Sequence, residues 1–511
     1  MELLKEILKA RVYDVAKRTP LDRAFDLSLA WENDIRIKRE DLQPIFSFKI
    51  RGAYNKIISL SPEERSRGVI CASAGNHGQG VALSAKLLNI PAWVVMPTTT
   101  PDIKIQAVAR HKAEIVLFGN QFSEASIHSQ ELARSLGAVM VHPFDDRHVI
   151  AGQGTIGREI LEDCPDVEYI FVPIGGGGLI AGIAAYVKAL NPDVQIIGVE
   201  PSDSDAMSQS VEAGSRIVLA KVGAFADGVA VRQVGEQTFR IVQEHVDTFV
   251  RVSTDEICSA IQDIYRETRT IVEPAGALSW AGAKSFIRDN ALKNKTIVTI
   301  NSGANMNFQR LQFAAERALT GAGLECLVAI RLPERRGALK EFCLKAISDR
   351  NITEFNYRSN DSAEAYLLLG VATPNPGDRQ RFYDKLLHHG YWYEDLTDNE
   401  LAKDHVRHMV GGRPPRLLEE QLYSFSFPDR SRALIDFLSV MSDRWNISLF
   451  HYRSHGSDYG KVLIAFEISH GEQDDFESHL RQTGCDFTRE THNLVFSMFL
   501  QASFPKPSTI A

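Results

Sequence analysis

Four consecutive glycines, Gly175–Gly178, follow a short apolar run and precede an apolar helical stretch that we expect to begin at Leu179. Glycines let the backbone N–H groups approach a ligand closely, and the N-terminus of a helix favours negative charge. A flexible turn is the other interpretation of such a run. Because this run lies between a predicted strand and a predicted helix, we interpret Gly175, Gly176, Gly177, Gly178 and Leu179 as a phosphate site.

A dinucleotide site would need a different spacing of glycines. The GxGxxG fingerprint requires its third glycine at position 180, where this chain has Ile180. The sequence also contains no GxxxxGK[ST] motif, which excludes the usual nucleotide P-loop.

Two further glycine-containing corners carry polar side chains. Backbone N–H groups of the turn Ser73–Gly78 could bind a carboxylate, and the Asn76 amide could reach a phenolic oxygen. Taken alone, Asn76 could equally be a turn residue and His77 a packed histidine. Ser302 follows another predicted strand, where a lone serine is most often a helix N-cap.

Lys49 lies between Phe48 and Ile50, just before a helical run. Most lysines are solvated surface charges, but an apolar setting lowers the pKa of a lysine and makes its neutral amine available for a Schiff base with an aldehyde. A phosphate site, a nucleophilic amine and polar groups able to face a ring together suggest pyridoxal phosphate. The spacing of these residues alone does not establish that cofactor.

The elements that must position these residues alternate between short β-rich runs and longer helical stretches from about residue 35 to 310. This alternation predicts βαβ units and a mostly parallel sheet, with ligands beyond the carboxyl ends of the strands. The predicted strands are Ile35–Lys38, Gly68–Ala72, Trp93–Met96, Glu114–Phe118, Ala138–His142, Tyr169–Ile174, Gln195–Val199 and Thr296–Ile300.

An internal repeat follows at about residue 320. The segment that contains NITEFNYR matches the segment that contains NISLFHYR at a constant offset of 95 residues, so that Tyr357 corresponds to Tyr452. Each copy predicts a small α+β unit. Gly411, Gly412, Pro414 and Pro415 indicate a linker between them. Units that serve only in oligomer contacts are the alternative.

Composition excludes several classes of protein. The chain has 511 residues, 44% of them hydrophobic and 24% charged, which is typical of a globular protein of several domains. Its net charge of −8 argues against nucleic acid as a partner. No uncharged apolar run is long enough for a membrane span. The first residues lack the apolar core of a secretory signal, so we expect none. The six cysteines form no CxxC pair, so we expect no metal site and a reducing, cytoplasmic location.

Five motifs in the same order resemble those of the tryptophan-synthase-β-like, fold type II pyridoxal-phosphate enzymes. They are SFKIRGA, SAGNHGQG, GGGGLIAG, EPAGA at Glu273–Ala277 and NSGANMNF. The resemblance is closest to the biosynthetic threonine ammonia-lyases, also called threonine deaminases or dehydratases, whose paired ACT-like regulatory domains resemble the repeat. It implies a two-lobed, parallel-sheet α/β catalytic domain over residues 1–320. It further implies ACT-like domains over 325–399 and 421–493, joined by a linker over 400–420.

The resemblance also implies roles for the residues named above. Lys49 would bind pyridoxal 5′-phosphate as a Schiff base and act as the catalytic base. The four glycines and Leu179 would hold the phosphate, Asn76 the 3′-oxygen and Ser302 the pyridine nitrogen. The turn formed by Ser73, Ala74, Gly75 and Asn76 would bind the substrate carboxylate. The implied reaction converts L-threonine, and also L-serine, to a 2-oxo acid and ammonia, which for threonine is 2-oxobutanoate, in isoleucine biosynthesis.

By the same resemblance, isoleucine would be the feedback inhibitor, valine its antagonist and the protein a homotetramer. The candidate effector segments are Pro333–Leu339 and Pro428–Leu434, with Phe355, Tyr357, Phe450 and Tyr452. Two alternatives remain, a serine-preferring dehydratase of the same fold and an inert amino-acid-sensing protein.

Overall fold

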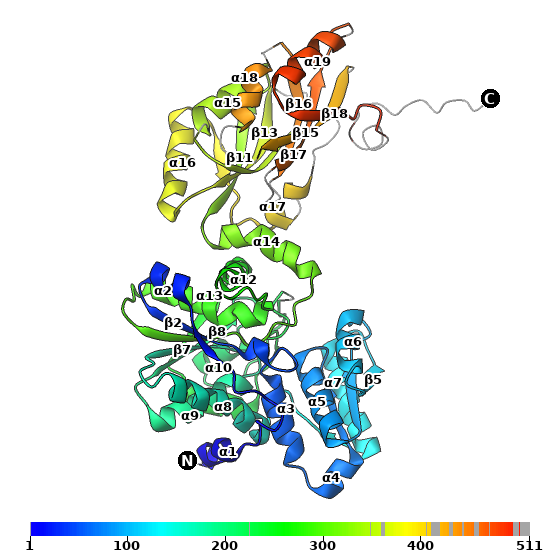
Figure 1. Cartoon of the computed structure of the whole chain (residues 1–511), viewed down its shortest axis with the longest axis vertical. Coiled ribbons are helices and arrows are strands. Elements are labelled where there is room, and N and C mark those ends of the chain that lie inside the picture. Colours follow the sequence, from blue (N-terminus) through cyan, green and yellow to red (C-terminus); the bar gives the residue numbers. More distant parts are fainter. Residues whose placement is uncertain are drawn as a thin grey trace, which may run out of the picture. The chain divides into compact units, whose positions relative to one another are not determined.

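The structure is a computed structural model that divides into two compact units, Met1–Gly321 and Ala322–Ala511 (Figure 1). It describes residues 2–223, 225–347, 349–358, 363–404, 406–409, 419–428, 433–441, 444–453, 459–469, 471–493 and 500. The predicted linker residues Gly411, Gly412, Pro414 and Pro415, and most of the candidate segment Pro428–Leu434, lie outside these ranges. Within these ranges, no helix is long and apolar enough to cross a membrane.

The first unit contains two sheets. The larger has the strand order β1-β2-β10-β7-β8-β9 and is parallel except for β1 at its edge. Its strands are β1 (Leu21–Arg23), β2 (Asp34–Lys38), β7 (Tyr169–Pro173), β8 (Gln195–Pro201), β9 (Thr248–Val252) and β10 (Thr296–Ile300). The smaller sheet, β5-β4-β3-β6, is parallel throughout. Its strands are β3 (Val69–Ala72), β4 (Ala92–Met96), β5 (Glu114–Leu117) and β6 (Val139–Met140).

Helices cover both faces of each sheet, which is why central strands such as β3, β4 and β7 are apolar throughout. On β7, Ile170 packs with the α8 and α9 side, whereas its neighbour Phe171 packs with α12 and α13. In the smaller sheet, Cys71 packs with α3 and α5, and Ile70 packs with α7. The helices are α1 (Glu2–Lys9), α2 (Phe25–Trp31), α3 (Lys49–Ile58), α4 (Pro62–Arg67), α5 (Asn76–Leu88), α6 (Asp102–Ala109), α7 (Phe122–Leu136), α8 (Arg147–Asp163), α9 (Gly178–Leu190), α10 (Ala206–Glu212), α11 (Glu236–His245), α12 (Thr254–Thr268), α13 (Pro274–Asp289) and α14 (Gln309–Gly321).

The predicted strands of this unit all occur, with small differences at their ends. Ala138–His142 is reduced to the two-residue β6, and β1 and β9 were not predicted. Both are edge strands with mostly exposed or half-buried residues, so they lack the apolar signature of the central strands. The helix predicted to begin at Leu179 begins one residue earlier, at Gly178.

The second unit holds the two copies of the repeat in one eight-stranded antiparallel sheet, ordered β14-β11-β13-β12-β16-β17-β15-β18. The copies meet where β12 pairs with β16, which places Phe355 opposite Tyr452 and Tyr357 opposite Phe450. The strands are β11 (Glu325–Pro333), β12 (Ile352–Arg358), β13 (Glu364–Ala372), β14 (Tyr393–Asp395), β15 (Glu420–Pro428), β16 (Asn446–Arg453), β17 (Tyr459–Glu467) and β18 (Asp486–Arg489). Side chains from α15 (Ala338–Ala346), α16 (Pro376–His388), α18 (Ala433–Val440) and α19 (Gln473–Gln482) share one apolar core with this sheet, and α17 (Glu400–Asp404) precedes β15.

Candidate active site

Lys49 is positioned by contacts between the segment that precedes it and the loop after β10. Ser47 and Gly303 form an isolated antiparallel bridge. Next to this bridge, the Phe48 N–H donates to the Ser302 carbonyl oxygen at 3.2 Å. The structure therefore brings two of the predicted site residues, Lys49 and Ser302, into adjoining backbone segments. Ser302 does not cap a helix, because α14 begins only at Gln309.

The Lys49 amine has few charges around it. Its Nζ donates to the Pro143 carbonyl oxygen at 2.8 Å and lies 5.2 Å from the centre of the Phe48 ring. Burial lowers the pKa of Lys49 from 10.5 to about 8, although the negative charge of Glu273 opposes this shift. A sizeable fraction of the amine is therefore neutral near physiological pH, as a nucleophile or a base must be.

The glycine run forms a close-fitting cradle against Phe144, the residue after Pro143, whose carbonyl oxygen accepts from Lys49. A Cβ on Gly176 would lie 2.2 Å from the Phe144 ring, and one on Gly178 would lie 3.0 Å from the backbone and Cβ of the same phenylalanine. Gly177, the N-cap of α9, has a φ of +94°, where residues with a side chain are strained. Leu179 is buried behind these glycines, in the first turn of α9. The N–H groups at this helix start suit an anion such as a phosphate.

The turn after β3 is shorter than predicted, because α5 begins at Asn76. The hydroxyl of Ser73 accepts hydrogen bonds from the N–H groups of Gly75 at 3.2 Å and Gly78 at 3.0 Å, which fixes the turn. A Cβ built on Gly75 would meet no atom of the described residues within 4 Å, so this glycine borders open space. Ala74, between Ser73 and Gly75, is half-buried.

Asn76 and Ser302 both have polar partners inside the unit. The Asn76 Nδ2 donates to the Glu273 Oε1 at 2.6 Å. The Ser302 hydroxyl donates to the Ala275 carbonyl oxygen at 3.1 Å, in the first turn of α13. Both corners are thus anchored to the start of the same helix, the part of the chain that carries the EPAGA motif.

A buried network of charges supports α3 behind Lys49. The Arg51 guanidinium donates to Glu40 at 2.7 Å and to Glu159 at 2.6 Å, and Lys38 donates to Glu159 at 2.7 Å. All four side chains are completely buried. Because removing one partner leaves an uncompensated charge, such a network holds β2, α3 and α8 in one arrangement.

Sequence reasoning did not identify several residues of this site. Pro143 and Phe144 contact Lys49 and the glycines, and Glu273 and Asn305 contact Asn76. Pro143 and Phe144 follow the predicted strand Ala138–His142, so the rule that ligands lie beyond strand ends would have found them. In the part of the chain that the structure describes, no three His, Cys, Asp or Glu side chains group as metal ligands.

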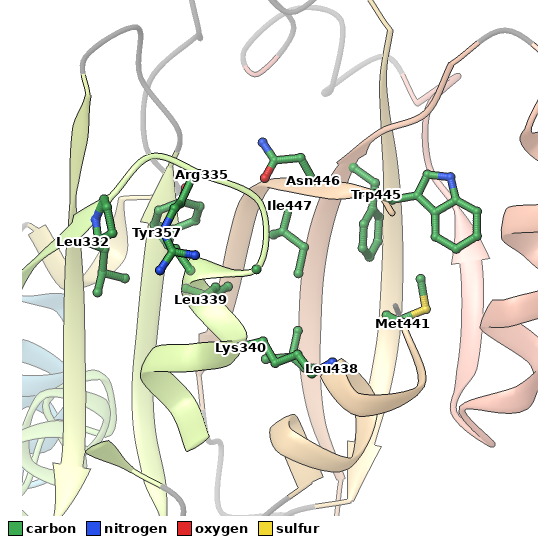
Figure 2. Close-up of a pocket in the computed structure, with 14 residues that line it drawn as sticks. Leu332, Arg335, Leu339, Lys340, Tyr357, Leu438, Met441, Trp445, Asn446 and Ile447 are labelled. Atoms are coloured by element: carbon green, nitrogen blue, oxygen red, sulfur yellow. The ribbon is translucent and has the colours of Figure 1, made fainter. Parts of the chain in front are cut away.

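A pocket lies in the second unit, between the two copies of the repeat (Figure 2). The empty space within it, including its opening to solvent, is about 540 Å³. Most of its lining residues have apolar side chains, and Arg335, Lys340 and Asn446 are the charged or polar members. The lining residues are Leu332, Pro333, Arg335, Gly337, Ala338, Leu339, Lys340, Tyr357, Leu438, Met441, Trp445, Asn446, Ile447 and Phe466. Of the candidate effector strand residues, only Tyr357 lines it, and its hydroxyl donates to Glu334 at 2.7 Å.

Comparisons with known proteins agree with this division of the chain. Residues 12–303 match the family described as pyridoxal-phosphate dependent enzyme, and residues 316–406 and 412–500 match the C-terminal regulatory domain of threonine dehydratase. The chain is 48% identical to L-threonine dehydratase biosynthetic IlvA of Burkholderia multivorans, over 98% of this chain and 99% of that protein. It is 45% identical to the Escherichia coli protein of the same name, over 98% and 97% of the two chains.

Solved structures resemble the catalytic unit. The processed form of threonine deaminase isoform 2 from Solanum lycopersicum has a TM-score of 0.61 and 50% identity, and covers 62% of this chain and 87% of its own. Maize serine racemase has a TM-score of 0.58 and 34% identity, and the match covers 62% of this chain and 97% of the racemase chain. The chain therefore belongs to the pyridoxal-phosphate dependent enzymes, in the group that carries the threonine dehydratase regulatory domain.

Proposed function

We propose that this protein converts L-threonine to 2-oxobutanoate and ammonia with pyridoxal 5′-phosphate as its cofactor. The observation that carries the proposal is the Lys49 amine, whose pKa is lowered to about 8 and which lies beside the glycine cradle. The names of the relatives and the family of residues 12–303 support it.

The residues present fit this cofactor. A phosphate is bound well by backbone N–H groups at the start of a helix, and the cradle offers such groups. Glycines are needed there because side chains at Gly176 and Gly178 would collide with Phe144. Gly175 to Gly178 and Leu179 would hold the phosphate, Asn76 the 3′-oxygen, Ser302 the ring nitrogen and Lys49 the aldehyde carbon. When bound, pyridoxal phosphate supplies an electron sink that stabilises negative charge at the Cα atom of an amino acid.

The chain would supply placement and proton transfer. The Ser73–Asn76 turn, with open space at Gly75, would bind the substrate carboxylate through its N–H groups. The neutral amine of Lys49 would accept the Cα proton. Loss of the β-hydroxyl as water and later hydrolysis then give the 2-oxo acid and ammonia, so that water is released and consumed once each.

Replacement of Lys49 by alanine tests the proposal. We expect the purified protein to be yellow, and Lys49→Ala to lose that colour and reduce threonine turnover on the order of a thousandfold or more. Lys56→Ala is the matched control, because Lys56 lies on the same helix and pairs with Asp146. Normal turnover by Lys49→Ala would end the proposal. Turnover of L-serine, measured alongside, would identify a serine-preferring enzyme.

We further propose that the pocket of the regulatory unit binds isoleucine as feedback inhibitor, with valine as its antagonist. The apolar wall formed by Leu438, Met441 and Trp445 suits a branched aliphatic side chain, and Arg335 suits an α-carboxylate. The family of residues 316–406 and 412–500 supports a regulatory role. The homotetramer and the cytoplasmic location remain predictions.

A further inference from the structure

Two residues of the recognised motifs, Glu273 and Asn305, form a chain of hydrogen bonds through Asn76. Asn305 Nδ2 donates to the Ile45 carbonyl oxygen at 2.8 Å and to the Asn76 Oδ1 at 2.7 Å. Asn76 Nδ2 donates onward to the Glu273 Oε1 at 2.6 Å. The chain thus runs from the segment before Lys49, through the loop after β10, to the start of α13.

The groups at the two ends of this chain of hydrogen bonds determine which atoms donate and which accept along it. A backbone carbonyl can only accept a hydrogen bond, so Asn305 must turn its nitrogen toward Ile45. That nitrogen then faces Asn76, which must present its oxygen. The Asn76 nitrogen consequently faces the carboxylate of Glu273, an acceptor. The amide orientation of Asn76 is therefore set by its neighbours, and one of its two amide hydrogens remains for a ligand.

The space around these hydrogen-bonded side chains is also restricted. A Cβ on Gly303 would lie 2.5 Å from the Glu273 Oε1 and 3.3 Å from the Asn76 Nδ2, so a side chain there would displace both groups. Glu273 is buried, and burial raises its pKa to about 7, while hydrogen bonds from the Asn76 side chain and from the Asn305 backbone N–H oppose that rise. Neighbouring charges on Asp227 and Lys104 act in opposite directions on it. The Asn76 amide and the Asn305 backbone N–H thus stabilise the negative charge of the Glu273 carboxylate, which is costly to bury.

We propose that Glu273 and Asn305 are positioning residues that lock the Asn76 amide with its nitrogen directed at the cofactor's 3′-oxygen. The inference rests on the proposed function, because it assumes that Asn76 contacts that oxygen. Neither residue needs to touch the cofactor, since each acts through Asn76.

A double-mutant cycle on the cofactor-loaded enzyme tests the inference. The variants are Asn76→Ala, Asn305→Ala, Glu273→Ala and the two doubles that contain Asn76→Ala. The readouts are the dissociation constant for pyridoxal phosphate and the position of its visible absorption band, which responds to hydrogen bonding at the 3′-oxygen. Asn290→Ala is the control, because this exposed asparagine donates only locally, to the Phe286 carbonyl oxygen at 2.9 Å.

Each single variant should weaken cofactor binding about tenfold, the loss of about one net hydrogen bond, and shift the band in the same direction. Each double variant should have the same dissociation constant and the same band position as Asn76→Ala alone. If Asn305→Ala does not fold, Asn305→Asp replaces the donor with an acceptor at unchanged size and should give the same weakening and band shift.

The outcomes separate two failures. If Asn76→Ala leaves affinity and spectrum unchanged, the assumed cofactor contact is wrong, and the proposed arrangement of the site fails with it. If Asn76→Ala weakens binding but the other single variants do not, or if the effects in the doubles add, only the positioning inference is overturned.

Discussion

At the scale of single residues, the pKa of Lys49 makes a specific prediction about pH. Burial lowers this pKa to about 8, and the neutral amine is the form that reacts with an aldehyde. Protein stripped of cofactor should therefore take up pyridoxal phosphate faster as the pH rises, with a midpoint near 8. An unperturbed lysine would instead give a midpoint near 10.4.

The measurement is the initial rate of colour formation as a function of pH. Lys49→Ala should form no colour at any pH, which isolates the contribution of this amine. A midpoint close to that of free lysine would show that the amine is solvated, contrary to the geometry around Pro143 and Phe48.

The resemblance of the five motifs assigned roles to Lys49, Asn76 and Ser302, whereas the local pattern alone left them open as a surface lysine, a turn residue and a helix N-cap. Glu273 and Asn305 could not be assigned roles in this way. Asn305 donates to Ile45, which is 260 positions away in the chain, and no local pattern reveals such a contact.

At the scale of elements, the corner between β7 and α9 depends on the absence of a side chain at Gly176. In Gly176→Ala, the new Cβ would lie 2.2 Å from the Phe144 ring, so the ring or the loop must move. We expect cofactor affinity to fall by at least about tenfold, because the N–H groups of the cradle move with the loop. Equilibrium titration with pyridoxal phosphate measures this loss.

Adding Phe144→Ala to Gly176→Ala removes the collision and should restore part of the affinity. Gly377→Ala is a neutral control, since its Cβ would meet nothing closer than 3.5 Å, at Asn375. Unchanged affinity in Gly176→Ala would contradict the role given to this corner.

The strands could be predicted from the sequence where both faces of the sheet are buried. Central strands such as Thr296–Ile300 agree with the prediction because both faces are covered and the run is apolar. The edge strand β9 was missed, since most of its residues are exposed or half-buried. Helix starts such as Asn76 differ by a few positions, because glycine-rich turns and first helical turns have similar composition.

At the scale of the whole molecule, the alternating pattern predicted a parallel-sheet unit and the 95-residue offset predicted duplicated α+β units, to which the family resemblance added the catalytic and regulatory roles. The sequence did not show that the two copies share one sheet. That union depends on the pairing of β12 with β16, and strand pairing across a linker leaves no periodic signal. The pocket between the copies follows from the same pairing, which explains why Trp445 and Met441 were not among the candidates.

The proposed effector site can be tested without disturbing catalysis. Arg335→Ala should raise the isoleucine concentration needed for half-inhibition about tenfold, the loss of one partly exposed charged contact to a carboxylate, with turnover unchanged in the absence of isoleucine. Arg331→Ala is the matched control, because Arg331 lies on β11, four positions before Arg335, but does not line the pocket. Truncation after Gly321, where the catalytic unit ends, should abolish the isoleucine response while turnover persists. Undiminished inhibition in either altered protein would place the effector site elsewhere.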